Sequence, residues 1–244
     1  MLVWGRFSKE GERPVANTDF ASQAFDNRPI HDVIIIAEFA LDVQSYAREF
    51  SQIVFPRPDN CPNCGQAGEL VGHGSYRRRP CDPEHTFLIR VKRFLCNACH
   101  RTISLLPSFC LPHRHYLAET IQSVLLLRIQ AGSSWNAIRR RFHPYDLPSL
   151  TTCREWVATF AKASPLYVEH LLRQLANWQL APGRLELAVA DISAQLSAPR
   201  QLLAAVPHLA AWLEEHRVGL LQSTARWLPT LARWGHAAKL GRVV

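Results

Sequence analysis

The sequence has no apolar stretch long enough to cross a lipid bilayer. Its uninterrupted apolar runs, such as Val33–Ala37, are no longer than five residues, whereas a membrane-spanning helix needs about 20. The segment Met1–Arg13 lacks the apolar centre of a secretory signal peptide, and no internal repeat or low-complexity tract is visible. We therefore expect a cytoplasmic protein with no membrane partner.

The composition is that of a chain that folds. Hydrophobic residues make up 48% of the 244 residues, and charged residues make up 20%, as in soluble globular proteins. Cysteines number seven, which is odd, and four of them stand in a metal-binding pattern. This usage is typical of a reducing compartment, where structural disulfides are rare.

Four cysteines form two matched pairs, Cys61-Pro62-Asn63-Cys64 and Cys96-Asn97-Ala98-Cys99. Two such pairs supply the four thiolates of a tetrahedral Zn²⁺ site. Gly65 follows the first pair, where a tight turn around a metal favours a residue without a Cβ atom. The pattern predicts a structural zinc ion bound by Cys61, Cys64, Cys96 and Cys99.

Other uses of the cysteine pairs explain the pattern less well. A redox dithiol accounts for one pair but not for the second, and no histidine follows either pair as c-type haem attachment requires. A catalytic zinc ion needs an open coordination position, which four thiolates do not leave. The same full shell argues against His73 as a ligand. The remaining cysteines, Cys81, Cys110 and Cys153, are expected to be unreactive thiols.

The residues around the cysteines read as a small antiparallel β structure. Residues 69–76 and 86–95 are strand-like and are joined by a turn-rich piece at 79–84. Residues 102–106 resemble a last strand. We therefore predict a four-cysteine zinc ribbon over residues 59–112.

Three amphipathic segments after the ribbon predict a helix-turn-helix over residues 113–164. The first, near 117–129, ends at Ala131-Gly132, and Ser133 or Ser134 caps the second, 135–142. Ser149 or Thr151 caps the third, 150–163, which would be the recognition helix. The connection 142–149 is longer than the tightest version of this motif allows. An ordinary helical bundle is the alternative.

Positive charge is concentrated in the middle of the chain. Residues 61–163 hold 14 Lys and Arg against six Asp and Glu, which favours a polyanionic partner over a merely solvated surface. We expect the runs Arg77–Arg79 and Arg139–Arg141 to contact DNA phosphates. The residues expected to contact DNA are Arg77, Arg78, Arg79, Arg139, Arg140, Arg141, Ser149, Thr151, Thr152 and Arg154.

The flanking regions are less informative. Residues 1–58 read as an N-terminal arm with a short strand at 33–37 and a helix at 43–50, capped by Asp42. Residues 165–244 read as a C-terminal helical region, with helices predicted at 165–178, 185–196, 199–212 and 219–234. Its tryptophans, Trp178, Trp212, Trp227 and Trp234, could be core anchors or a surface for a partner. The overall fold class is therefore predicted to be α+β.

Three segments of the chain together resemble the N-terminal zinc ribbon of insertion-sequence transposases. They are Pro56-x-Pro58-x-x-Cys61-Pro62-x-Cys64-Gly65, Gly72-His73-Gly74-x-Tyr76-x-Arg78, and the run from Arg93-Phe94-x-Cys96-x-x-Cys99 to Leu106-Pro107. The chain is also similar to uncharacterised bacterial proteins that join such a ribbon to a helix-turn-helix and travel with mobile elements. The resemblance covers about residues 54–160 and implies recognition of the terminal DNA of an element.

The resemblance does not extend to the catalytic part of a transposase. That part needs three spaced carboxylates that hold two metal ions. The acidic residues after the helices are Glu169, Glu186, Asp191, Glu214 and Glu215, and no strand pattern surrounds them. We therefore predict a non-catalytic DNA-binding protein of a mobile element, an accessory or regulator of transposition or integration, associated with the bacterial nucleoid. Two alternatives are a DNA-binding subunit that works with a separate transposase or integrase chain, and a zinc-stabilised protein scaffold.

Overall fold

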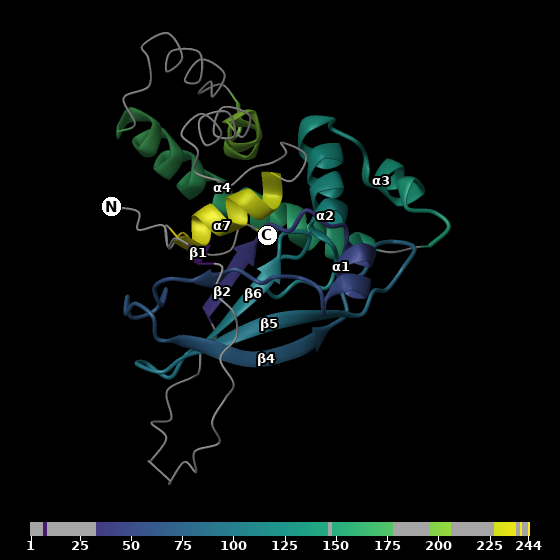
Figure 1. Ribbon diagram of the computed structural model, residues 1–244. Coiled ribbons are helices and arrows are strands. Elements are labelled where there is room, and N and C mark those ends of the chain that lie inside the picture. Colours follow the sequence, from purple (N-terminus) through teal and green to yellow (C-terminus); the bar gives the residue numbers. More distant parts are fainter. Residues whose placement is uncertain are drawn as a thin grey trace, which may run out of the picture.

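The structure is a computed structural model that describes residues 7–8, 33–145, 148–177, 196–205, 227–237, 240 and 244. These residues form a mixed α+β fold, in which helices gather on one side of a small twisted sheet (Figure 1). Within the described ranges, none of the helices combines the length and apolar character that a membrane span requires. The α+β prediction is thereby confirmed.

The sheet has four strands in the order β2-β6-β5-β4. They are β2 (Val33–Ala37), β4 (Leu70–Arg78), β5 (Ile89–Cys96) and β6 (Thr102–Pro107). The pairs β4–β5 and β5–β6 are antiparallel, as predicted for the residues around the cysteines. A separate pair joins β1 (Phe7–Ser8) to β3 (Arg57–Pro58). The other residues of the predicted N-terminal arm before Val33 lie outside the described ranges.

Strand β2 extends the sheet beyond the predicted ribbon. It pairs in parallel with β6, so that Val33 lies opposite Ile103 and Ala37 opposite Pro107. Parallel neighbours need a crossover connection, and here it includes α1 (Val43–Glu49), whose first turn is capped by Asp42 as predicted. Tyr46 of α1 is fully buried in the same hydrophobic cluster as the sheet. The boundary predicted at residue 58 therefore runs through one continuous core.

The helical half begins as the sequence predicts. Helix α2 (Ala118–Leu125) continues into the π-helical turn η1 (Leu126–Gln130), and Gly132 follows with a positive φ of 64°. That conformation favours glycine. Helix α3 (Trp135–Arg141) is capped by Ser134, whose hydroxyl accepts a hydrogen bond from the amide of Ala137.

Helix α4 (Leu150–Asn177) is longer than the predicted helix, which was expected to end at Ala163. Pro165 lies inside it and lacks the amide that would bond to the preceding turn. The buried hydroxyl of Ser164 donates to the carbonyl of Phe160 at 2.6 Å, a contact that can accompany a bend in a helix. The predicted separate helix 165–178 is therefore a continuation of α4, and the boundary predicted at residue 164 falls within it.

A second hydrophobic core joins the helices to α7 (Trp227–Ala237). Its members include Ile138 of α3 and Trp156 and Phe160 of α4. Trp227 is buried and packs edge-on against Phe160 with ring centroids 6.0 Å apart, which fits the core reading of this residue. Residues 198–205 are helical, and all of them except residue 198 fall within the predicted helix 199–212. Outside the described ranges lie Trp178 and Trp212, the predicted helix 185–196 apart from its last residue, and the acidic residues Glu186, Asp191, Glu214 and Glu215.

Candidate functional site

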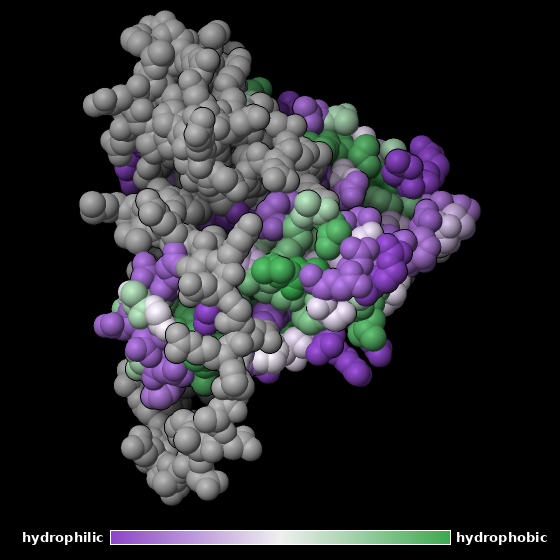
Figure 2. Space-filling model, in the orientation of Figure 1, coloured by the Kyte–Doolittle hydropathy of each residue, from purple (hydrophilic) through white to green (hydrophobic). Residues whose placement is uncertain are grey.

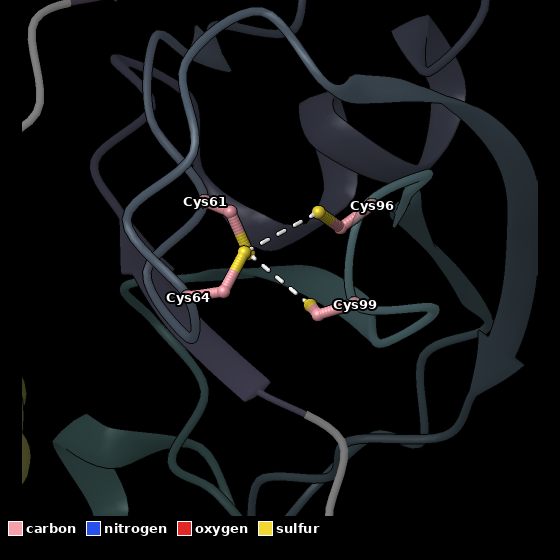
Figure 3. A group of neighbouring side chains, drawn as sticks. All are labelled: Cys61, Cys64, Cys96 and Cys99. Carbon is pink, nitrogen blue, oxygen red and sulfur yellow. Dashed lines mark hydrogen bonds between the residues drawn. The ribbon is translucent and has the colours of Figure 1, made fainter.

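The four paired cysteines meet at one end of the β4–β5 hairpin (Figure 3). The Sγ atoms of Cys61, Cys64, Cys96 and Cys99 all lie within 4.8 Å of one another. Two of the separations are 3.7 Å, between Cys61 and Cys99, and 3.8 Å, between Cys64 and Cys96. Two loops distant in sequence thus present their sulfurs to a common point.

The two cysteine loops have the same backbone hydrogen bonds. In the first loop, the amide of Gly65 donates to the carbonyl of Cys61, and the amide of Cys61 donates to the carbonyl of Gln66. In the second, His100 and Arg101 make the equivalent bonds with Cys96. Gly65 and His100, at matching positions, both have positive φ, 78° and 54°. Only the first loop has the glycine that this backbone favours, and the sequence gives no comparable signal at His100.

The loops are fixed to the sheet and to each other. The amide of Asn97 in the second loop donates to the carbonyl of Glu69, which directly precedes β4. Cys61 and Cys96 are buried in the core of the sheet, whereas Cys64 is exposed. The sulfur cluster therefore has a packed inner side and an open outer side.

Polar groups surround the sulfurs. Burial raises the pKa of the Cys61 thiol, against the opposing effect of the backbone amides of Cys64 and Asn63. Burial also acts to raise the pKa of Cys99, but hydrogen bonds from the side chain of Asn63 and the backbone of Arg101 together bring that pKa below its usual value. The Asn63 amide lies 3.5 Å from the Cys99 sulfur. These amides would stabilise thiolates that bind a metal, a role for Asn63 that no sequence pattern indicates.

The cluster fits a tetrahedral metal ion bound by sulfur. Zinc–thiolate bonds of about 2.3 Å place the four sulfurs about 3.8 Å apart in a regular tetrahedron, close to the 3.7 and 3.8 Å between the sulfur pairs. The four cysteines could therefore hold a metal ion. Four protein ligands would complete its coordination, which suits a structural rather than a catalytic ion.

The three arginines of the predicted run Arg77–Arg79 differ in their exposure to solvent. Arg77 and Arg79 are exposed, but Arg78 is half-buried. The Arg78 guanidinium donates to the carbonyls of Leu111 and Arg114 and so ties β4 to the loop before α2. A side chain engaged in this way is not available to a phosphate, so the structure assigns Arg78 a role in holding the loop.

The second basic run is fully at the surface. Arg139, Arg140 and Arg141 are all exposed at the end of α3, the helix that projects from the right-hand side of the molecule in Figure 1. Hydrophilic residues gather there on the face shown in Figure 2. Among the described residues, none of the three forms an ion pair. Their place in the last helical turn is also favourable for the helix dipole.

The predicted recognition residues at the start of α4 differ in whether their side chains are already hydrogen-bonded within the protein. Ser149 is the cap, because its hydroxyl accepts from the amide of Thr152 at 3.2 Å. The Thr152 hydroxyl lies 3.0 Å from the same oxygen and is occupied by this contact. Thr151 and Arg154 are exposed. Of the four predicted contacts, these two are therefore the side chains that are open to a ligand.

Trp135 of α3 contacts side chains from the elements before and after that helix. The guanidinium carbons of Arg128 and Arg154 lie 4.9 Å and 5.5 Å from its ring centroid. Arg128 also donates to the carbonyl of Ser133, at the turn before α3. The three side chains come from η1, α3 and α4, so no local sequence pattern brings them together.

Comparison with known proteins finds one match, to part of the chain. Residues 61–140 match the family model of a domain of unknown function, DUF6431. The match begins at Cys61, includes all four cysteines, and ends in the basic run of α3. No curated protein and no solved structure matches the chain. The cysteine cluster and two of the α3 arginines, Arg139 and Arg140, thus lie within the matched segment.

Proposed function

We propose that this protein is a non-catalytic DNA-binding protein in which a structural Zn²⁺ ion supports a zinc ribbon and the following helices act as a helix-turn-helix. The observation that carries the proposal is the exposure of Arg139, Arg140 and Arg141 on α3, together with that of Thr151 and Arg154 in the first turns of α4. Three neighbouring guanidinium groups with no ion pair among the described residues form a surface suited to DNA phosphates.

The cysteine cluster supports the zinc part of this proposal. Its two loops have matching hydrogen bonds, and two of its sulfur–sulfur distances are those of a tetrahedral zinc site. Cys61, Cys64, Cys96 and Cys99 would hold the ion, which would join the two ends of the β4–β5 hairpin. Zinc binding to such sites supplies about 10–16 kcal/mol in small domains.

The order and packing of the helices support the DNA-binding part. Helix α3 is followed, after a connection of residues 142–149, by α4, and both contribute to one hydrophobic core. In a helix-turn-helix, the second helix presents its first residues to base edges in the major groove. Thr151 and Arg154 have the exposure that this role requires. The resemblance to transposase ribbons suggests the terminal DNA of a mobile element as the target.

The salt dependence of binding to duplex DNA tests this function. Fluorescence anisotropy with a labelled duplex of random sequence should show an affinity that falls steeply as salt rises, because bound arginines release counterions. The triple variant R139Q/R140Q/R141Q should bind more weakly and show a salt slope reduced by up to about three. A zinc-loaded wild-type protein without duplex affinity would contradict the proposal.

A matched triple variant controls for the loss of charge. Arg48, Lys162 and Arg173 are exposed positions outside α3, and R48Q/K162Q/R173Q removes the same formal charge. We expect this control to bind nearly as well as the wild type. Equal loss in both variants would mean that net charge alone, rather than the α3 surface, accounts for binding.

A further inference from the structure

Two arginines face each other directly on the edge strand of the sheet and its neighbour. Arg77 of β4 is the register partner of Arg90 of β5, and both side chains are exposed. Residues directly opposite in an antiparallel pair project from the same face with Cβ atoms about 5 Å apart. Lys92 follows two residues after Arg90 and so lies on that face as well. We call Arg77, Arg90 and Lys92 the basic strand face.

The pair lies where the sheet is only two strands wide. Strand β5 pairs with β6 from Lys92 to Leu95, whereas Arg90 has a partner on β4 alone. Strand β4 is the edge of the sheet (Figure 1). A large ligand can therefore reach this two-stranded part of the sheet without obstruction from a further strand.

The repulsion between Arg77 and Arg90 lowers the stability of the sheet unless a negative charge compensates for it. Like charges placed directly opposite in a sheet are destabilising, and neither Arg77 nor Arg90 forms an ion pair within the described part of the chain. Arg90 is nonetheless held in place, because its Nε donates to Ser75 at 3.1 Å and its guanidinium lies 4.9 Å from the Phe50 ring centre. A fixed positive pair without a counter-charge is better explained by a ligand than by folding.

We propose that the basic strand face binds the phosphate backbone of duplex DNA, as a second contact surface in addition to α3. The inference rests on the proposed function. Duplex rather than single-stranded DNA fits, because single-strand sites offer exposed aromatic rings on which bases stack. On this face Phe94 is buried, and Phe50 is half-buried beneath Arg90. Phosphate contacts of this kind fix register but carry no sequence information.

The inference predicts opposite effects on stability and on binding. In the variant Arg77→Glu, the repulsive cross-strand pair becomes an attractive one. The melting temperature should stay the same or rise, while DNA binding weakens because a phosphate contact is replaced by a repelling charge. If Arg77 had only a structural role, its replacement would not weaken DNA binding while leaving the melting temperature unchanged or higher.

The experiment compares Arg77→Glu with Lys162→Glu, which makes the same charge change at an exposed position of α4. The probe is a 20-base-pair duplex of random sequence, and its dissociation constant is measured across a series of salt concentrations beside the melting temperature. Arg77→Glu should raise the dissociation constant about tenfold and reduce the salt slope by at least about one. Lys162→Glu should change the dissociation constant less than about threefold. Arg77→Gln serves if the glutamate variant does not fold.

The outcomes separate this inference from the proposed function. If Arg77→Glu and Lys162→Glu bind alike while the wild type binds duplex DNA, the basic strand face is not a contact surface and the proposed function stands. If Arg77→Glu binds weakly but its melting temperature also falls, and Arg77→Gln behaves likewise, the pair is structural and the inference is overturned. If the wild type does not bind duplex DNA at all, the proposed function fails and this inference fails with it.

Discussion

The guanidinium of Arg154 lies over the indole ring of Trp135, with its central carbon 5.5 Å from the ring centroid. Trp135 begins α3 and Arg154 lies in the second turn of α4. The contact therefore spans the two helices that would form the DNA-binding unit. Cation–π contacts contribute about 0.5–1 kcal/mol at exposed sites, enough to restrain a side chain that would otherwise be free.

Replacing Trp135 should loosen this link. In Trp135→Leu, the loss of the ring should lower the free energy of unfolding by about 1–2 kcal/mol and weaken preference among DNA sequences, because Arg154 loses its support. Trp135→Phe keeps an aromatic face and should therefore lose less stability and less sequence preference than Trp135→Leu. Denaturant unfolding and selection from a randomised duplex pool measure the two effects. Identical behaviour of the leucine and phenylalanine variants would show that the ring contact has no role.

The cysteine cluster predicts which thiols are needed for zinc. Cys64→Ser should abolish stoichiometric zinc binding with little direct loss of packing, because Cys64 is exposed. Cys81→Ser, outside the cluster, should retain one zinc ion per chain. Elemental analysis of the purified variants provides the measurement. Retention of a full zinc ion by Cys64→Ser would remove this residue from the ligand set.

The cap of α4 allows a paired test of stability. Ser149→Ala removes the hydroxyl that accepts from the Thr152 amide and should cost about 1 kcal/mol of unfolding free energy. Thr151→Ala, two residues further on and exposed, should change stability by less than about 0.5 kcal/mol. If the two variants lose the same stability, Ser149 is not the cap.

Gly235 marks the close approach of α7 to α4. A Cβ atom at this position would overlap the ring of Tyr167, which is fully buried. Alanine normally stabilises a helix interior by about 1 kcal/mol relative to glycine. Here Gly235→Ala should instead destabilise the protein, by about 1–3 kcal/mol.

A double-mutant cycle identifies the source of that loss. In a Tyr167→Leu background the ring is absent, so the cost of Gly235→Ala should shrink or change sign. Thermal unfolding of the four proteins gives the coupling energy. Additive effects would mean that α7 does not pack on Tyr167 as the structure describes.

Local sequence signals were sufficient for much of the fold. Asp42 and Ser134 cap the helices predicted to follow them, because a cap depends on residues within one turn. The four cysteines come together because each pair forms its own loop. Gly132 ends the first helical segment with a positive φ, as its residue type predicts.

The features that the sequence did not predict depend on distant partners. The parallel pairing of β2 with β6 joins residues about 70 positions apart, and no local periodicity encodes such a neighbour. Helix α4 continues past Pro165 because tertiary packing outweighs the missing amide bond. Arg78 looks like its neighbours in sequence, yet it is the one whose guanidinium reaches the carbonyls of Leu111 and Arg114.

The most direct test of the account measures DNA affinity while zinc is returned to metal-free protein. If an ion held by four sulfurs gives the DNA-binding surface its shape, affinity for duplex DNA should be weak without metal and should rise to a plateau at one zinc ion per chain. Full affinity in protein shown to contain no metal, or no affinity in protein that carries one zinc ion, would contradict it.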